Sequence, residues 1–495
     1  MSDQVNKKIK TGISGLDDLL QGGLPEHRLY LIEGSPGTGK TTLALQFLLE
    51  GRRLGERCLY VTLSENKEEL RCVAESHGWS LDGIDLYELE ANQSRLQPEQ
   101  DYTVFHPEEV ELAETIRHVC DHVERIRPGR VVFDSLSEMR MLARNPLRYR
   151  RQILTLKQFF SGRECTVLLL DDTVSREAEL QLQSISHGVL SLERLGQEYG
   201  VSRRRVNIVK LRGTKFRDGY HDYTIDTGGI QVFPRLVAAD HRQDHTRSMA
   251  SSGIEELDLL LGGGLSGGTS TLITGPAGSG KSSLSGTYLL AAARRGQRGK
   301  AYIFEETRQM FLDRMAGLGM DLTEYVSSGQ IAIQQVDPAE LSPGEFTHGL
   351  REDVERDRVD LLVVDSLQGY LNAMPNERFL LVQLHEVLAY LAESGVLTIM
   401  VAAQHGMIGP MQSTLDISYL ADTVILLRFF ESGGALKKAI SVVKHRLTAH
   451  EKTIREFELT PHGLRFGPVL REFRGVLTGV PEYLGNTESL LDPEQ

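Results

Sequence analysis

The chain has 495 residues, 25% of them charged, and a formal net charge of −13. This length is too great for a single hydrophobic core and favours two domains of about 240 residues each. The acidic balance argues against a general electrostatic grip on nucleic acid or on an anionic membrane, so we expect neither as a partner.

The sequence shows no targeting or membrane segment. It contains no run of about 18 apolar residues, and its first residues lack the apolar centre of a signal peptide. We therefore expect a cytoplasmic protein. Its four cysteines, Cys58, Cys72, Cys120 and Cys165, form no C-x-x-C pair. This pattern predicts reduced thiols, neither a disulfide framework nor a zinc site.

A phosphate-binding loop pattern, G-x-x-x-x-G-K-[ST], occurs twice, each time between an apolar β-prone run and a helical pattern. In such loops the backbone N–H groups surround the phosphates, the lysine neutralises them, and the next hydroxyl ligates Mg²⁺. The sequence therefore predicts two nucleotide sites. Their expected binding residues are Gly34, Ser35, Pro36, Gly37, Thr38, Gly39, Lys40, Thr41 and Thr42, and Gly275, Pro276, Ala277, Gly278, Ser279, Gly280, Lys281, Ser282 and Ser283.

The repeat extends beyond the loops. The segment 12–24 matches 253–265 at the offset of 241 residues that also separates Lys40 from Lys281. A repeat of this size is a domain. We expect a first domain over 1–236, a polar linker over 237–252, a second domain over 253–470 and a mobile tail over 471–495. Apolar strands alternate with helical segments, which predicts an α/β fold with a mostly parallel sheet flanked by helices.

An apolar strand ends on an aspartate in each half, at Asp134 and at Asp365, and a serine follows both. An acid at the carboxyl end of a buried parallel strand lies near the nucleotide crevice of such folds. We expect Asp134 with Thr41, and Asp365 with Ser282, to organise Mg²⁺. The alternative is an ordinary strand-ending aspartate.

With these residues assembled, the chain resembles the KaiC family of double-domain RecA-like ATPases and autokinases, from Gly12 to about Gly479. The opening Gly-Ile-x-x-Leu-Asp, Glu-Glu, Asp-Ser, Lys-Leu-Arg-Gly-Thr and the closing 453–457 segment occur in the family's order. The resemblance implies two tandem RecA-like P-loop NTPase domains that bind ATP and Mg²⁺. It also implies a hexamer of two stacked rings, with ATP between neighbouring subunits.

That arrangement gives a role to a basic pair that recurs near the end of each half, Lys210 and Arg212, then Lys444 and Arg446. Reaching the γ-phosphate from the adjacent subunit, such a pair would stabilise the charge that develops in phosphoryl transfer. The alternative is a solvated pair at a strand end.

The resemblance makes Glu305 the general base, supported by Glu306. In the first half the corresponding pair is Ser64 and Glu65. Because a serine cannot take up a proton at neutral pH, Glu65 must serve alone or hydrolysis there is weak. The alternative is that these carboxylates cap the helices that follow.

The resemblance also implies self-phosphorylation of the second domain on a neighbouring serine and threonine. Ser418 keeps the first acceptor, whereas Tyr419 replaces the second, and Thr423 is expected to be packed in a strand. A loop serine that bonds to backbone is the alternative for Ser418.

Two other functions stay open. One is a nucleic-acid-dependent RecA-like motor or recombination accessory, which the net charge and the lack of an aromatic-rich basic stretch disfavour. The other is a signalling scaffold in which ATP only holds the hexamer together. The acidic tail after Arg474 is a candidate docking site for a regulator, and nothing in the sequence identifies that regulator or a clock role.

Overall fold

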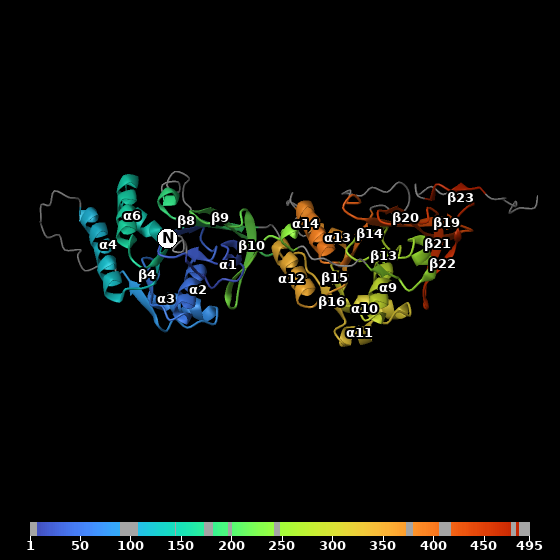
Figure 1. Ribbon diagram of the computed structural model, residues 1–495, viewed down its shortest axis with the longest axis horizontal. Coiled ribbons are helices and arrows are strands. Elements are labelled where there is room, and N and C mark those ends of the chain that lie inside the picture. The colour runs from blue at the N-terminus through green and yellow to red at the C-terminus, as the bar shows by residue number, and fades with distance from the viewer. Residues whose placement is uncertain are drawn as a thin grey trace, which may run out of the picture. The chain divides into compact units, whose positions relative to one another are not determined.

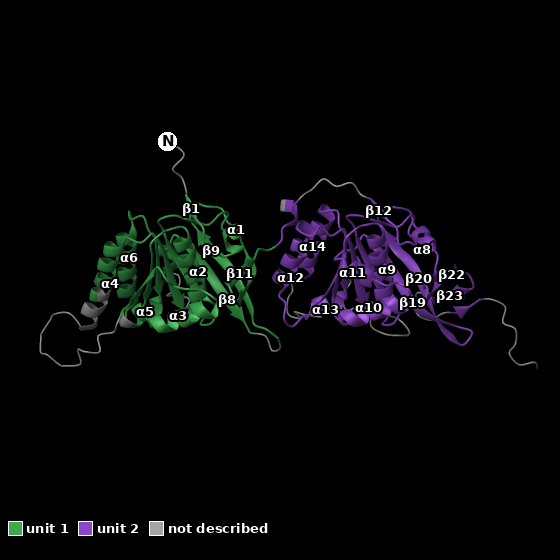
Figure 2. Ribbon diagram, turned by 90° about the horizontal axis from the view of Figure 1, so that it is seen from below, with its two compact units in different colours: residues 1–235 green, residues 236–495 purple. Residues whose placement is uncertain are grey.

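The computed structural model describes residues 7–89, 107–143, 145–172, 182–196, 200–241, 248–372, 380–404, 417–476 and 482–484. The chain forms two compact units, residues 1–235 and residues 236–495, coloured separately in Figure 2. Each unit contains one nine-stranded sheet with helices beside it (Figure 1). Among the residues described, no helix is both long and apolar enough to cross a membrane.

The first unit follows the alternating order expected from the sequence. Its elements are β1 (Lys8–Ile9), α1 (Leu16–Leu19), β2 (Leu24–Pro25), β3 (Leu29–Gly34), α2 (Lys40–Arg53), β4 (Cys58–Thr62), α3 (Lys67–Ser76), β5 (Ile84–Glu88), α4 (Pro107–Ile126), β6 (Arg130–Asp134), α5 (Leu136–Ala143), α6 (Pro146–Phe160), β7 (Thr166–Asp172), β8 (Gly188–Leu195), β9 (Arg203–Leu211), β10 (Tyr220–Asp226) and β11 (Gly229–Phe233).

The second unit repeats this order. Its elements are η2 (Ala238–His241), β12 (Met249–Ala250), α8 (Glu255–Leu260), β13 (Leu265–Ser266), β14 (Ser270–Gly275), α9 (Lys281–Arg294), β15 (Gly299–Ile303), α10 (Arg308–Gly317), α11 (Thr323–Ser327), β16 (Ile331–Gln335), α12 (Pro343–Glu355), β17 (Leu361–Asp365), α13 (Leu367–Asn372), α14 (Leu380–Glu393), β18 (Leu397–Ala403), β19 (Thr423–Ser432), β20 (Ala435–His445), β21 (Arg455–Thr460), β22 (Gly463–Val469), β23 (Phe473–Arg474) and β24 (Glu482–Tyr483).

The two large sheets have one strand order. In the first it is β11-β10-β9-β8-β3-β7-β6-β4-β5, and in the second the matching order is β22-β21-β20-β19-β14-β18-β17-β15-β16. Strands from β5 to β8 pair in parallel, and β9, β10 and β11 extend the sheet in antiparallel pairs. The prediction of a mostly parallel α/β sheet is confirmed. The strand before each phosphate loop lies in the middle, so the carboxyl ends of its parallel neighbours reach the same edge.

The central strand β3 is buried on both faces. Tyr30 and Ile32 pack in a core cluster with residues of α1, α2 and α3. Leu29 and Leu31 pack in a second cluster with residues of α4, α5 and α6. This alternation explains the continuous apolar run of the strand, because a parallel strand covered on both faces has no solvent side. The second unit has the same two layers, on either side of β14.

The segments expected to be a linker and a mobile tail are partly structured. Ala238 of the expected linker is buried in a core cluster of the second unit, together with Leu236, the last residue of the expected first domain. The Ala238 N–H donates to a Glu386 carboxylate oxygen at 3.3 Å. In the tail, Val476 is 1% exposed and packs with Phe430. The sequence suggested otherwise because both segments are polar overall and hold only isolated apolar residues. Residues 242–247 of the expected linker and residues 477–481 and 485–495 of the expected tail lie outside the described residues.

A buried histidine in β10 predicts that the first unit loses stability in acid. His221 is 2% exposed, its Nδ1 accepts the Arg235 N–H at 2.9 Å, and burial lowers its pKa to about 4. The unfolded chain, with a histidine pKa near 6.5, takes up the proton first. The stability present above pH 6.5 is therefore lost as the pH falls towards 4, by about 2 kcal/mol between pH 7 and pH 5.

Denaturant titrations at these two pH values would measure this loss. The fluorescence of Trp79, which is the chain's one tryptophan and packs on the first unit's core, reports the transition of that unit. His221→Asn keeps an acceptor but does not titrate, so its unfolding free energy should change less between the two values. An equal change in both proteins would refute the role of His221.

Candidate functional site

Each phosphate loop joins a central strand to the first turn of a helix. The chain leaves β3 at Gly34 and enters α2 at Lys40, and it leaves β14 at Gly275 and enters α9 at Lys281. The residue before each helix is a glycine in the left-handed region, with φ of 91° at Gly39 and 103° at Gly280. Glycine adopts this conformation without steric cost. The N-terminus of each helix thus faces its loop, where unpaired N–H groups favour an anion.

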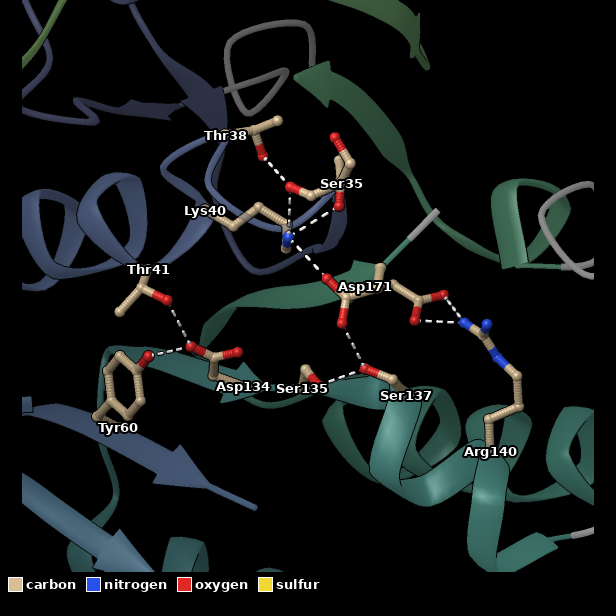
Figure 3. Close-up of polar contacts among 12 residues, drawn as sticks. Ser35, Thr38, Lys40, Thr41, Tyr60, Asp134, Ser135, Ser137, Arg140 and Asp171 are labelled. Carbon is tan, nitrogen blue, oxygen red and sulfur yellow. Dashed lines mark hydrogen bonds and ion pairs between the residues drawn. The ribbon is translucent and has the colours of Figure 1, made fainter. Parts of the chain in front are cut away.

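The lysine of the first loop folds across it. Lys40 is 8% exposed, and its Nζ donates to the Gly34 carbonyl at 2.8 Å and to the Ser35 carbonyl at 3.2 Å (Figure 3). Nζ also forms an ion pair with Asp172 at 2.8 Å. In the second loop, Lys281 Nζ donates to the Pro276 carbonyl at 2.8 Å. Burial lowers the pKa of Lys281, and the charges of Asp365 and Glu305 oppose this effect.

The structure brings together the two residues expected to organise Mg²⁺ in the first half. Asp134 is 7% exposed, and its Oδ2 accepts the Thr41 hydroxyl at 3.0 Å and the Tyr60 hydroxyl at 2.5 Å (Figure 3). Burial raises the pKa of Asp134, and these two hydrogen bonds act in the opposite direction. The carboxylate is held beside the helix start by groups that donate to its charged form.

The corresponding residues also meet in the second half. Burial raises the pKa of Asp365 to about 6, against a hydrogen bond from Ser282. Asp365 Oδ2 is buried without a hydrogen-bond partner in the described part of the chain, so it remains a free oxygen ligand. An aspartate and a hydroxyl suit Mg²⁺, which keeps water and phosphate oxygens as its other ligands. Among the described residues, no group of three or more His, Cys, Asp or Glu side chains that could hold a metal occurs.

The two acids after β15 have different partners. Glu305 accepts a hydrogen bond from the Ser366 hydroxyl, next to Asp365. Glu306 pairs with Arg314 at 2.5 Å, and Arg314 also donates to the Ser283 hydroxyl at 3.1 Å. The charge of Glu306 is thus neutralised by an arginine of α10, whereas the side chain of Glu305 is exposed.

The first half lacks both of these partnerships. Ser64 is exposed, and Glu65 Oε2 is buried without a partner among the residues described. Burial raises the pKa of Glu65, and the charges of Asp134 and Glu69 raise it further. The repeat places Val73 where the second half has Arg314. The sites therefore differ by more than the replacement of one acid.

Sequence reasoning missed an acidic pair that ends β7. Asp171 pairs with Arg140, and burial raises the pKa of Asp171 to about 6 (Figure 3). Asp172 accepts the Ser137 hydroxyl at 3.0 Å and contacts Lys40. The rule applied to Asp134, that an acid ending an apolar strand lies near the crevice, would have indicated this pair as well.

The first basic pair does not contact its own loop among the described residues. Lys210, in β9, donates to the Gln183 carbonyl, and Arg212, just after β9, donates to the Ser184 carbonyl at 2.9 Å. Both side chains lie against the segment that leads into β8.

The second basic pair lies against the segment of the expected phosphoacceptor. Lys444 Nζ donates to the Ser418 carbonyl at 3.0 Å and to the Ala421 carbonyl at 2.6 Å. Arg446 pairs with Asp422 at 3.1 Å. Ser418 is half-buried, and Thr423, 2% exposed, is packed in β19 as expected.

Comparison with known proteins gives one family. A family model described as "ATPase: KaiC" matches residues 9–237 and again residues 250–470. The chain is 27% identical to the circadian clock protein KaiC3 of Synechocystis over 97% of this chain and 96% of that protein. It is 28% identical to the circadian clock oscillator protein KaiC of Thermosynechococcus vestitus over 96% of this chain and 92% of that protein.

Proposed function

The chain belongs to the KaiC family of ATPases, and from this premise we propose that it binds and hydrolyses ATP at two sites. One repeated geometry carries the proposal. In each half a buried lysine folds across a glycine-rich loop, and the hydroxyl after that lysine bonds to a buried aspartate. Binding of a nucleoside triphosphate with Mg²⁺ requires this arrangement.

The residues divide the work of phosphoryl transfer. Lys40 and Lys281, with the loop N–H groups, bind the phosphates. Thr41 with Asp134, and Ser282 with Asp365, would hold Mg²⁺, which neutralises the charge that develops on the phosphates. In the second site Glu305 would position and deprotonate the attacking hydroxyl or water. Glu65 is the candidate in the first site.

We propose that the chain assembles into a hexamer of two rings, with each basic pair acting on the nucleotide of a neighbouring subunit. Two observations support this. The similar proteins include circadian clock oscillator proteins, which the chain matches over nearly their whole length. Within the residues described, the basic pairs contact backbone segments of their own unit and not its phosphate loop. A regulator that docks on the tail after Arg474 belongs to the same proposal.

A second function, autokinase activity, is favoured by the position of Ser418. Its carbonyl accepts from Lys444, the residue proposed to reach a neighbouring nucleotide, so Ser418 and that nucleotide would lie near each other in the ring. Transfer of the γ-phosphate to the Ser418 hydroxyl would be assisted by Glu305 of the subunit that holds ATP. Tyr419, which is exposed, replaces the second acceptor that the family resemblance implies, so Ser418 is the remaining candidate acceptor.

Substitution of Glu305 should separate binding from turnover. In full-length Lys40→Ala protein, where only the second loop binds, Glu305→Gln should retain Mg·ATP and reduce ATP turnover by about 100-fold, as loss of a general base does. Glu65→Gln in Lys281→Ala protein is the matched variant. Unchanged turnover would refute the assignment of Glu305, and strong stimulation by single-stranded DNA would favour the motor function.

Substitution of Arg446 tests the assembly. Native mass spectrometry of the wild type should show a six-chain species that depends on ATP. Arg446→Ala should weaken that species and lower turnover by about 10-fold or more, because one charge on the transferred phosphate is lost. If assembly and turnover are both unchanged, the residue does not act on a neighbouring subunit.

Phosphosite mapping tests the kinase activity. After incubation with Mg·ATP, the peptide spanning 414–428 should carry a phosphate on Ser418. This phosphate should be absent from Ser418→Ala and from Lys281→Ala proteins. A wild-type peptide without phosphate would reduce the activity of the chain to ATP hydrolysis.

A further inference from the structure

The two loop lysines have different counter-charges. Lys40 pairs with Asp172 at 2.8 Å, and the two side chains are 9% and 32% exposed. Among the residues that the structure describes, Lys281 forms no ion pair, and its Nζ donates to the Pro276 carbonyl. The family comparison does not account for this difference, because both halves match the same family model.

Strand register shows which residue replaces Asp172 in the second half. In the first sheet Gly34, the first loop residue, lies opposite Asp172. In the second sheet Gly275 lies opposite Ala403. The second site therefore has a methyl group where the first has a carboxylate. There, Gln368 bonds to the Ala403 backbone at 2.7 Å and 2.9 Å, whereas Ser137 holds the Asp172 carboxylate.

The serine hydroxyls near these acids also have different partners in the two sites. In the second site Ser366 donates to Glu305. In the first half the residues equivalent to Ser366 and Glu305 are Ser135 and Ser64, so a hydroxyl replaces the carboxylate. The Ser135 hydroxyl lies 2.5 Å from that of Ser137. Ser137 in turn donates to Asp172 at 3.0 Å. The first site thus has Ser64 where the second has the carboxylate of Glu305, and it has the carboxylate of Asp172 at the end of β7, paired with the loop lysine.

This ion pair has a cost for nucleotide binding. Lys40 must turn its charge towards the phosphates when ATP binds, which leaves the partly buried Asp172 without its counter-ion next to a polyanion. Repulsion from Asp172 is strongest for ATP without a divalent cation, because no cation then offsets the negative charge of its phosphate groups. With Mg²⁺ held by Thr41 and Asp134, the bound nucleotide would carry less negative charge and its repulsion from Asp172 would be smaller.

We propose that Asp172 is a positioning residue that competes with the triphosphate for Lys40 and makes the first site select Mg·ATP over cation-free ATP. The second site, with Ala403 at this position, has less of this selectivity. The inference rests on the proposed binding of ATP at the first loop and deepens it by stating the form of nucleotide that this loop accepts.

Binding of a fluorescent ATP analogue, mant-ATP, to the full-length protein tests the inference. The Lys281→Ala background leaves only the first site, and titrations are made with Mg²⁺ or with EDTA. Asp172→Asn keeps the shape of the side chain and its bond from Ser137 but removes the charge. It should tighten cation-free binding by about tenfold, which corresponds to about 1.4 kcal/mol. Binding with Mg²⁺ should change by less than about twofold, since the cation already lowers the repulsion.

Two variants serve as controls. Asp171→Asn removes a neighbouring carboxylate that pairs with Arg140, and it should leave the ratio of the two affinities near that of the wild type. Ala403→Asp, in the Lys40→Ala background, should weaken cation-free binding at the second site. The fluorescence of Trp79 checks that the first unit remains folded.

The outcomes separate the inference from the proposed function. If Asp172→Asn leaves the ratio unchanged while Mg·ATP binds normally, the inference is overturned and the function stands. A tenfold gain in both conditions also overturns it, because the charge would then act without regard to the cation. If the Lys281→Ala protein binds no Mg·ATP, both the function of the first site and the inference are overturned.

Discussion

The buried ammonium group of each loop lysine is the constraint on which the rest of each site depends. Lys40 and Lys281 are both 8% exposed at the first position of their helices. A charge so buried requires hydrogen bonds and counter-charges, because its desolvation is costly. The loop carbonyls and the carboxylates at the strand ends supply them. A phosphate group can take over from these partners, and the ease of this exchange differs between the sites because Lys40 has an ion pair to give up.

The sheet determines which carboxylates can reach the lysine. Each loop strand lies between parallel neighbours, so residues far apart in the sequence end at one edge. Asp134 and Asp172 of the first unit both lie there, at the ends of β6 and β7. In the second unit Asp365 ends β17, Ala403 ends β18, and the acids Glu305 and Glu306 follow β15. The duplicated frame is the same, whereas the positions of the acids have diverged.

The local part of each site could be predicted from the sequence. The motif fixes the strand, loop and helix, and the strand-ending aspartates Asp134 and Asp365 followed from apolar runs. The strand-end rule would have placed Asp172 near the crevice, but not its contact with Lys40, because that contact depends on β7 lying next to β3 and no local pattern encodes that order of strands. The pairing of Glu306 with Arg314 was missed for a different reason, since it depends on the side-chain directions of α10. Isolated apolar residues such as Val476 gave no sign that a polar tail would pack.

We propose that one chain holds two ATP sites with unequal chemistry. The most direct measurement is the nucleotide content of wild-type protein, extracted at intervals after incubation with a limited amount of Mg·ATP. Two bound nucleotides per chain are predicted, with ADP appearing in two phases of unequal rate, because Glu305 is the proposed base of one site and Glu65 the candidate in the other. Substitution of Lys40 or of Lys281 should remove one phase each. One nucleotide per chain, or a single phase that both substitutions lower equally, would contradict the presence of two unequal ATP sites.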